Sequence, residues 1–130
     1  MGKIIGKISL IVEGDNISID NLDMLIGITH SVYKRKGESA SKIMDVLEHD
    51  IVQYTENIDE ATVDLTIYEF CRKVSKRITE VDKEYICNMR IYIQSDYAQI
   101  YWKLRKETIG ALHSCNVDCE FSILSWGECN

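Results

Sequence analysis

The sequence predicts an α+β protein in which helices cover one face of a mainly antiparallel sheet. Stretches rich in Ile and Val alternate with stretches whose apolar residues recur every three or four positions. Turn residues such as Gly and Asn separate these stretches. The expected order, strand–helix–strand–strand–helix–strand, is that of a ferredoxin-like unit (βαββαβ), and a C-terminal helix and strand follow it. The length of 130 residues predicts a single domain, 1–130.

The first half of the chain predicts three strands and one helix. Residues 3–13 form a strand that Gly14 ends, and Ser18 caps a short helix over 18–26. Gly27 is placed to end that helix in the left-handed conformation. Strands are expected over 29–36 and 49–55.

The second half opens with the strongest helix signal in the chain. We expect Asn57 to be its N-cap and Glu60 to reach back to that cap. Apolar residues then recur at helical spacing, at Val63, Ile67, Phe70, Val74, Ile78 and Val81. A strand over 86–94, a helix over 105–115 and a final strand over 117–126 complete the prediction.

The composition narrows the possible partners and the compartment. A formal net charge of −6 disfavours binding to nucleic acid or to an anionic membrane surface, because both need basic protein surfaces. No apolar stretch is long enough for a transmembrane helix, and the N-terminus lacks the pattern of a signal peptide. The five cysteines form no CxxC pair, which suits free thiols in a reducing compartment. We expect a cytoplasmic protein.

The residue patterns indicate no catalytic, metal or cofactor site. None of the three histidines lies in a known catalytic motif, so we expect a protein that is not an enzyme. The densest possible metal-binding group is His113, Cys115 and Cys119, with Cys129 nearby in sequence. Separate core cysteines are the simpler interpretation, and the sequence leaves open whether the group binds metal.

Carboxylates are the unusual feature of the chain, since no Lys or Arg occurs between Lys42 and Arg72. A solvated acidic face is one interpretation. The other is an acidic docking surface that attracts a basic protein partner. The partner-binding residues predicted on this second interpretation are Asp45, Glu48, Asp50, Glu56, Asp59 and Glu60.

Residues 8–38 carry a family resemblance. A strand ending in Glu-Gly-Asp, a short acidic helix leading into Gly-Ile-Thr at 27–29, and Lys-Gly-Glu at 36–38 follow one another. This succession resembles a bacterial family of small single-domain proteins, domain-of-unknown-function family number 4279. The resemblance implies an immunity protein that binds and neutralises a cognate bacterial toxin, delivered by contact or secretion. A ligand-sensing or dimerising assembly module is the alternative.

Overall fold

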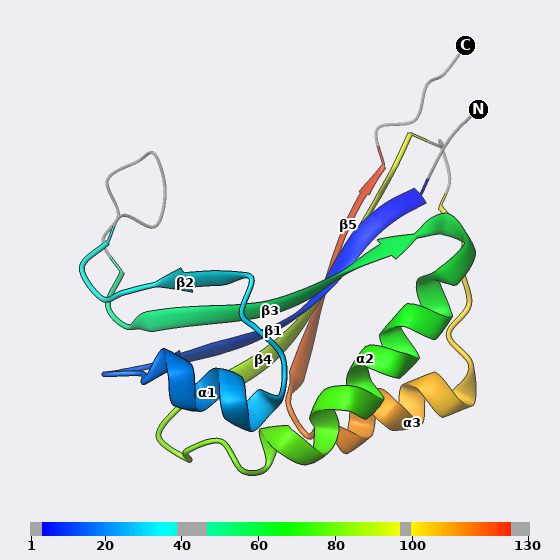
Figure 1. Ribbon diagram of the computed structural model, residues 1–130. Coiled ribbons are helices and arrows are strands. Elements are labelled where there is room, and N and C mark those ends of the chain that lie inside the picture. Colours follow the sequence, from blue (N-terminus) through cyan, green and yellow to red (C-terminus); the bar gives the residue numbers. More distant parts are fainter. Residues whose placement is uncertain (1–3, 39–46, 97–99, 126–130) are drawn as a thin grey trace.

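Five strands and three helices alternate along the part of the chain that the computed structural model describes, residues 4–38, 47–96 and 100–125 (Figure 1). In chain order they are β1 (Ile4–Gly14), α1 (Ile19–Ile26), β2 (Val32–Lys34), β3 (Asp50–Asp59), the 3₁₀ turn η1 (Glu60–Thr62), α2 (Val63–Ile78), β4 (Ile86–Ser95), α3 (Lys106–Ser114) and β5 (Asp118–Ser125). Among the described helices, none has the length and apolar character needed to cross a bilayer.

The strands form one sheet in the order β2-β3-β1-β4-β5. Strand β1 lies antiparallel between β3 and β4, and β2 is antiparallel to β3. Among the described strands, β5 alone is parallel to its neighbour, β4. The predicted α+β class, with a mainly antiparallel sheet, is therefore confirmed.

All three helices lie on one side of the sheet (Figure 1). Alternate residues of the central strand point to that side, and Ile8, Leu10 and Val12 are completely buried there. Helix α2 supplies the opposing apolar stripe, including Ile67 and Phe70, which are also completely buried. The other side of the sheet, which no described helix covers, is called the open face below.

Two strands differ from the prediction by several residues. The second strand is only three residues long, Val32–Lys34, instead of spanning 29–36. The third strand continues to Asp59, so Asn57 pairs with Lys7 of β1 and is not a helix cap. The cap before the helical region is Asp59, whose carboxylate accepts the Ala61 N–H at 3.0 Å. Pairing with β1 buries Ile58, which favours the longer strand.

Candidate protein-binding surface

The structure does not bring the predicted acidic residues together. Asp45 lies outside the described residues, and Glu48 is exposed just before β3 begins. Asp50 and Asp59 stand at opposite ends of β3, which places them about 30 Å apart along an extended strand. The two residues also lie on different faces of the sheet. Successive side chains of a strand point to opposite faces, so Asp50 points to the helix side and Asp59 to the open face.

Asp50 is committed to the interior of the protein. It is only 6% exposed, and its two carboxylate oxygens accept the backbone N–H groups of Ile17 (3.0 Å) and Lys36 (2.7 Å). These bonds tie the β1–α1 loop and the segment after β2 to the start of β3. The carboxylate therefore stabilises the fold and is not available to a partner.

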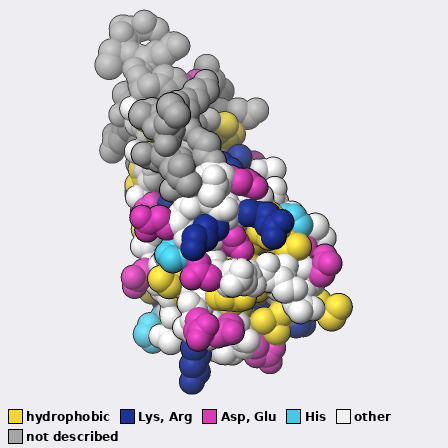
Figure 2. Space-filling model, turned by 90° about the vertical axis from the view of Figure 1, so that its left-hand side faces the viewer, with side chains coloured by type: hydrophobic (Ala, Val, Ile, Leu, Met, Phe, Trp, Pro, Cys, Tyr) yellow, Lys and Arg dark blue, Asp and Glu magenta, His cyan; other side chains and the backbone are white. Residues whose placement is uncertain are grey.

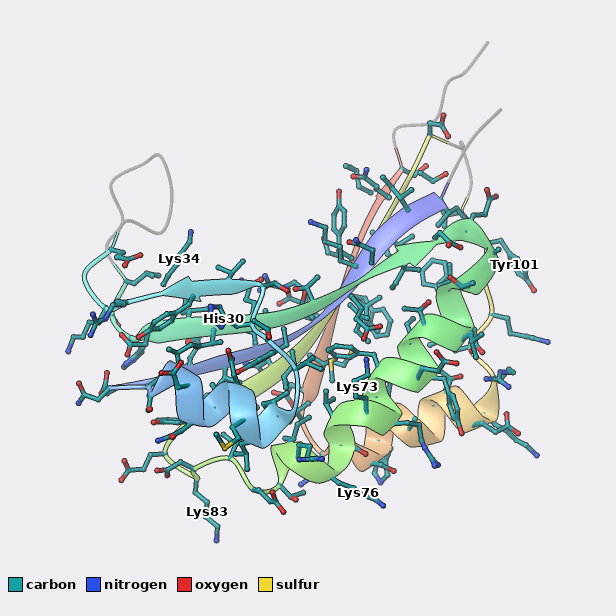
Figure 3. The ribbon with its side chains drawn as sticks, in the orientation of Figure 1. His30, Lys34, Lys73, Lys76, Lys83 and Tyr101 are labelled. Carbon is teal, nitrogen blue, oxygen red and sulfur yellow. The ribbon has the colours of Figure 1, made fainter. Side chains whose placement is uncertain are left out.

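The remaining candidates have different surroundings. Glu56 lies on the helix side of β3 and forms an ion pair with Lys73 of α2 (Figure 3). Asp59 caps the turn that begins α2, where it also accepts the Thr62 hydroxyl at 3.0 Å. Glu60 follows Asp59 and is exposed. Of the six predicted residues, Asp59 is the one that the register of β3 places on the open face.

The end of the molecule where β3 begins is not uniformly acidic. Figure 2 shows Asp and Glu side chains there interspersed with Lys and Arg side chains. Lys34, the last residue of β2, pairs with Ile51 near the start of β3, and Arg35 and Lys36 follow it. Neighbouring charges of opposite sign cancel much of the field that a long acidic run would otherwise produce.

The open face of the sheet carries more apolar side chains than a simply solvated face requires. Antiparallel sheets that are wet on one side usually alternate apolar-in with polar-out. Here the registers of the strands place seven apolar side chains on the open face: Ile5, Ile11, Val32, Ile51, Ile86, Tyr92 and Leu124. Ile5 is 44% exposed, Ile86 59% and Leu124 48%.

One part of this face forms a shallow concavity, which we call the open-face patch. It has a volume of about 510 Å³ over the start of β1, the end of β3 and the end of β4. Its side chains on the open face are Ile5, Lys7, Asn57, Asp59, Tyr92 and Gln94. An apolar centre, an aromatic ring, one carboxylate and one ammonium group thus share a single patch.

The sequence patterns did not indicate a polar group that Asp23 forms with Tyr54 and His30. The buried Tyr54 hydroxyl donates to Asp23 Oδ1 at 2.7 Å, and His30 Nδ1 lies 2.8 Å from Asp23 Oδ2. Burial, and then the hydrogen bond to Asp23, raises the pKa of Tyr54 above its usual range. The group ties α1 and the loop after it to β3. No spacing in the sequence connects these three residues, because β3 is distant from α1 along the chain.

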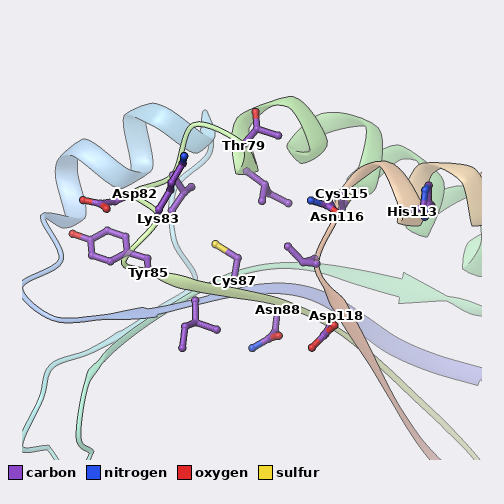
Figure 4. Close-up of a pocket in the computed structure, with 14 residues that line it drawn as sticks. Thr79, Asp82, Lys83, Tyr85, Cys87, Asn88, His113, Cys115, Asn116 and Asp118 are labelled. Carbon is purple, nitrogen blue, oxygen red and sulfur yellow. The ribbon is translucent and has the colours of Figure 1, made fainter.

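A hollow near the end of α2 holds its lysine and its histidine far apart. It has a volume of about 680 Å³ and lies between the end of α2, the start of β4 and the turn before β5. Lys83 and His113 lie at its opposite ends, and Cys87 lies between them (Figure 4). Burial raises the pKa of the Cys87 thiol to about 11, so the thiol stays protonated at neutral pH and is a weak nucleophile.

The cysteines near the C-terminus behave as core residues within the described part of the chain. Cys115 is 1% exposed, and its Sγ lies 3.4 Å from the carbonyl oxygen of Ala111 and 3.7 Å from that of Cys71. Contact with Cys115, and then burial, raises the pKa of Cys71. Cys129 lies outside the described residues. Among the described ones, no three His, Cys, Asp or Glu side chains are grouped to hold a metal ion.

We found no match to this chain among models of known protein families, curated proteins or solved structures. The resemblance drawn from residues 8–38 therefore stays a prediction.

Proposed function

We propose that this protein is a non-catalytic binding domain that neutralises a bacterial toxin, and that the open-face patch contacts the toxin. The observation that carries the proposal is the uncovered apolar surface on the open face. Ile5 keeps 44% of its surface exposed beside Tyr92, in a concavity that no described helix covers. Isolated exposed apolar residues are ordinary, but a concave group with a polar rim is typical of a binding surface.

The composition of the patch matches the usual anatomy of protein interfaces. Tyr92 is of a residue type that is enriched among energetically dominant contacts, and Ile5 supplies apolar area diagonally across from it. Lys7, which lies between Asn57 and Tyr92, adds an ammonium group, and Asn57 and Gln94 add amide groups that can form hydrogen bonds.

The toxin, as the partner, is inferred from the family resemblance and from charge. Immunity proteins act inside the producing cell by covering the active site of a toxin or a surface close to it. A nuclease toxin has a basic substrate cleft, which a protein of net charge −6 would attract. Within the patch, Asp59 is the carboxylate placed to meet such a cation.

The test is to express the tagged protein together with its adjacent open reading frame and to measure the affinity of any complex. Ile5→Glu should weaken binding by at least about thirtyfold, because it places a charge in the centre of the interface. Leu65→Glu is the matched control, since Leu65 is 47% exposed but lies on α2, on the opposite side of the sheet. Equal affinities for the two variants would contradict the assignment of the patch.

One observation favours the alternative function, a ligand-sensing or dimerising assembly module. The sheet ends in a long outer strand, β5, that no other described strand pairs on its far side.

A further inference from the structure

The two edges of the sheet differ in how well they are protected. An exposed strand edge presents unpaired N–H and C=O groups, and proteins commonly protect it by short length, by lysine or by proline. Edge strand β2 has three residues and is followed by further basic residues after Lys34. Edge strand β5 has eight residues and contains no lysine, arginine or proline. Its two charged residues, Asp118 and Glu120, lie in the first half of the strand, so among the described residues the second half of the β5 edge lacks the usual protection.

Three of the exposed side chains of β5 are apolar. Phe121 is 45% exposed and Ile123 54%, and both point to the helix side of the sheet. Leu124, on the open face, is 48% exposed. Strand β5 forms the outer margin of the sheet (Figure 1). An exposed apolar edge of this length invites pairing with another strand.

We propose that β5 pairs antiparallel with β5 of a second copy of this chain, joining the two sheets into one. A two-fold axis perpendicular to the sheet keeps the helices of both subunits on the same side. Residues that face each other across the axis must then point to the same face. With Ser122 on the axis, Phe121 lies opposite Ile123 of the partner subunit, and the same contact occurs twice. Such aromatic–β-branched pairs stabilise sheets.

The charges of β5 favour this arrangement over a parallel one. Both carboxylates, Asp118 and Glu120, lie in the first half of the strand, and the residues from Ser122 onward are uncharged. Antiparallel pairing about Ser122 places Glu120 opposite Leu124 of the partner subunit, away from the partner's carboxylates. In-register parallel pairing would instead place Asp118 and Glu120 directly opposite the same two carboxylates of the partner subunit. Within its own subunit, Glu120 accepts a hydrogen bond from Arg90 Nε at 2.9 Å, which offsets its charge.

The first test is the solution mass of the full chain, measured by sedimentation over a range of concentrations. We expect the wild-type mass to rise toward twice the monomer value with concentration. Ile123→Lys should raise the dissociation constant at least about tenfold, because it removes an apolar pair at two symmetric places. Ile109→Lys is the matched control, since Ile109 on α3 is 55% exposed and lies away from the edge. A wild-type chain that is monomeric throughout, or equal effects of the two variants, would overturn the proposal.

The second test addresses the register. Ser122→Cys should form an intersubunit disulfide under mild oxidation, because residues facing each other on the axis have Cα atoms about 4.5–5.5 Å apart. Ser114→Cys on α3 and the wild-type chain measure background cross-linking by the other cysteines. Equal cross-linking in all three would refute the Ser122 register. These measurements do not depend on the proposed function, since a monomer could still bind a toxin through the open-face patch.

Discussion

Replacing Asp50 tests whether its carboxylate stabilises the fold or binds a partner. The sequence places Asp50 among six residues for a partner, whereas the structure shows its oxygens accepting the N–H groups of Ile17 and Lys36. Asp50→Ala removes both acceptors and leaves two backbone donors without them. Asp50→Asn retains one acceptor oxygen and turns an NH₂ group toward the other N–H donor. Its stability should therefore lie between those of the wild-type protein and Asp50→Ala.

The size of the effect follows from these two hydrogen bonds. A hydrogen bond to a charged group contributes about 1.5–3 kcal/mol, so Asp50→Ala should lower the free energy of unfolding by about 3–6 kcal/mol. A domain of this length has a total stability of about 6–20 kcal/mol, which makes the loss a large fraction of the whole. The midpoint of thermal unfolding should fall by at least about 10 °C.

Thermal and urea unfolding, followed by circular dichroism, measure this loss directly. Glu48→Gln is the matched control, because Glu48 is exposed two residues away and its replacement should change stability by less than about 0.5 kcal/mol. If Asp50→Ala unfolds at the wild-type temperature, the two hydrogen bonds contribute nothing and the structural role assigned to Asp50 is refuted.

Three further predictions concern single interactions. Gly27→Ala should cost about 1 kcal/mol by urea unfolding, because Gly27 ends α1 at φ 88° and an alanine there is strained; a neutral result would contradict the strain. Tyr54→Phe should cost about 1.5–3 kcal/mol through loss of the 2.7 Å hydrogen bond to Asp23, and unchanged stability would show that this bond contributes nothing. The hydrogen bond between Asp15 and His49 raises the pKa of His49 and lowers that of Asp15. The stability that protonated His49 contributes is therefore lost progressively as pH rises above about 6.5. The stability that ionised Asp15 contributes is lost as pH falls below about 4, so the pair stabilises the fold fully only between these values. NMR titration should show the His49 pKa falling toward its ordinary value in Asp15→Asn, and no change would refute the pairing.

Local patterns in the sequence predicted most of the elements. The helical spacing of apolar residues from Val63 to Ile78 is the clearest case, because a 16-residue amphipathic stripe has few alternatives. Gly27 ends α1 in the left-handed conformation as predicted, since glycine alone adopts it without a steric cost. The end of β3 was misjudged because Asn57 and Glu60 imitate a capping pair, whereas pairing with β1 extends the strand.

Non-local contacts could not be predicted. The N–H groups that bond to Asp50 belong to Ile17, which precedes it by 33 positions, and to Lys36, which precedes it by 14. Folding brings both to the start of β3. An acidic stretch looks continuous in sequence, but a strand turns alternate side chains to opposite faces and separates its ends. The open-face patch is likewise assembled from three strands, which is why no single segment of the sequence indicates it.

Neutralisation can be measured in cells as survival when the adjacent open reading frame is induced alone or together with this protein. We expect the neighbour to kill cells when expressed alone, the wild-type protein and Leu65→Glu to restore growth, and Ile5→Glu, expressed to the same level, to fail to do so. A harmless neighbour, or full protection by Ile5→Glu, would contradict the claim that this protein neutralises a toxin through the open-face patch.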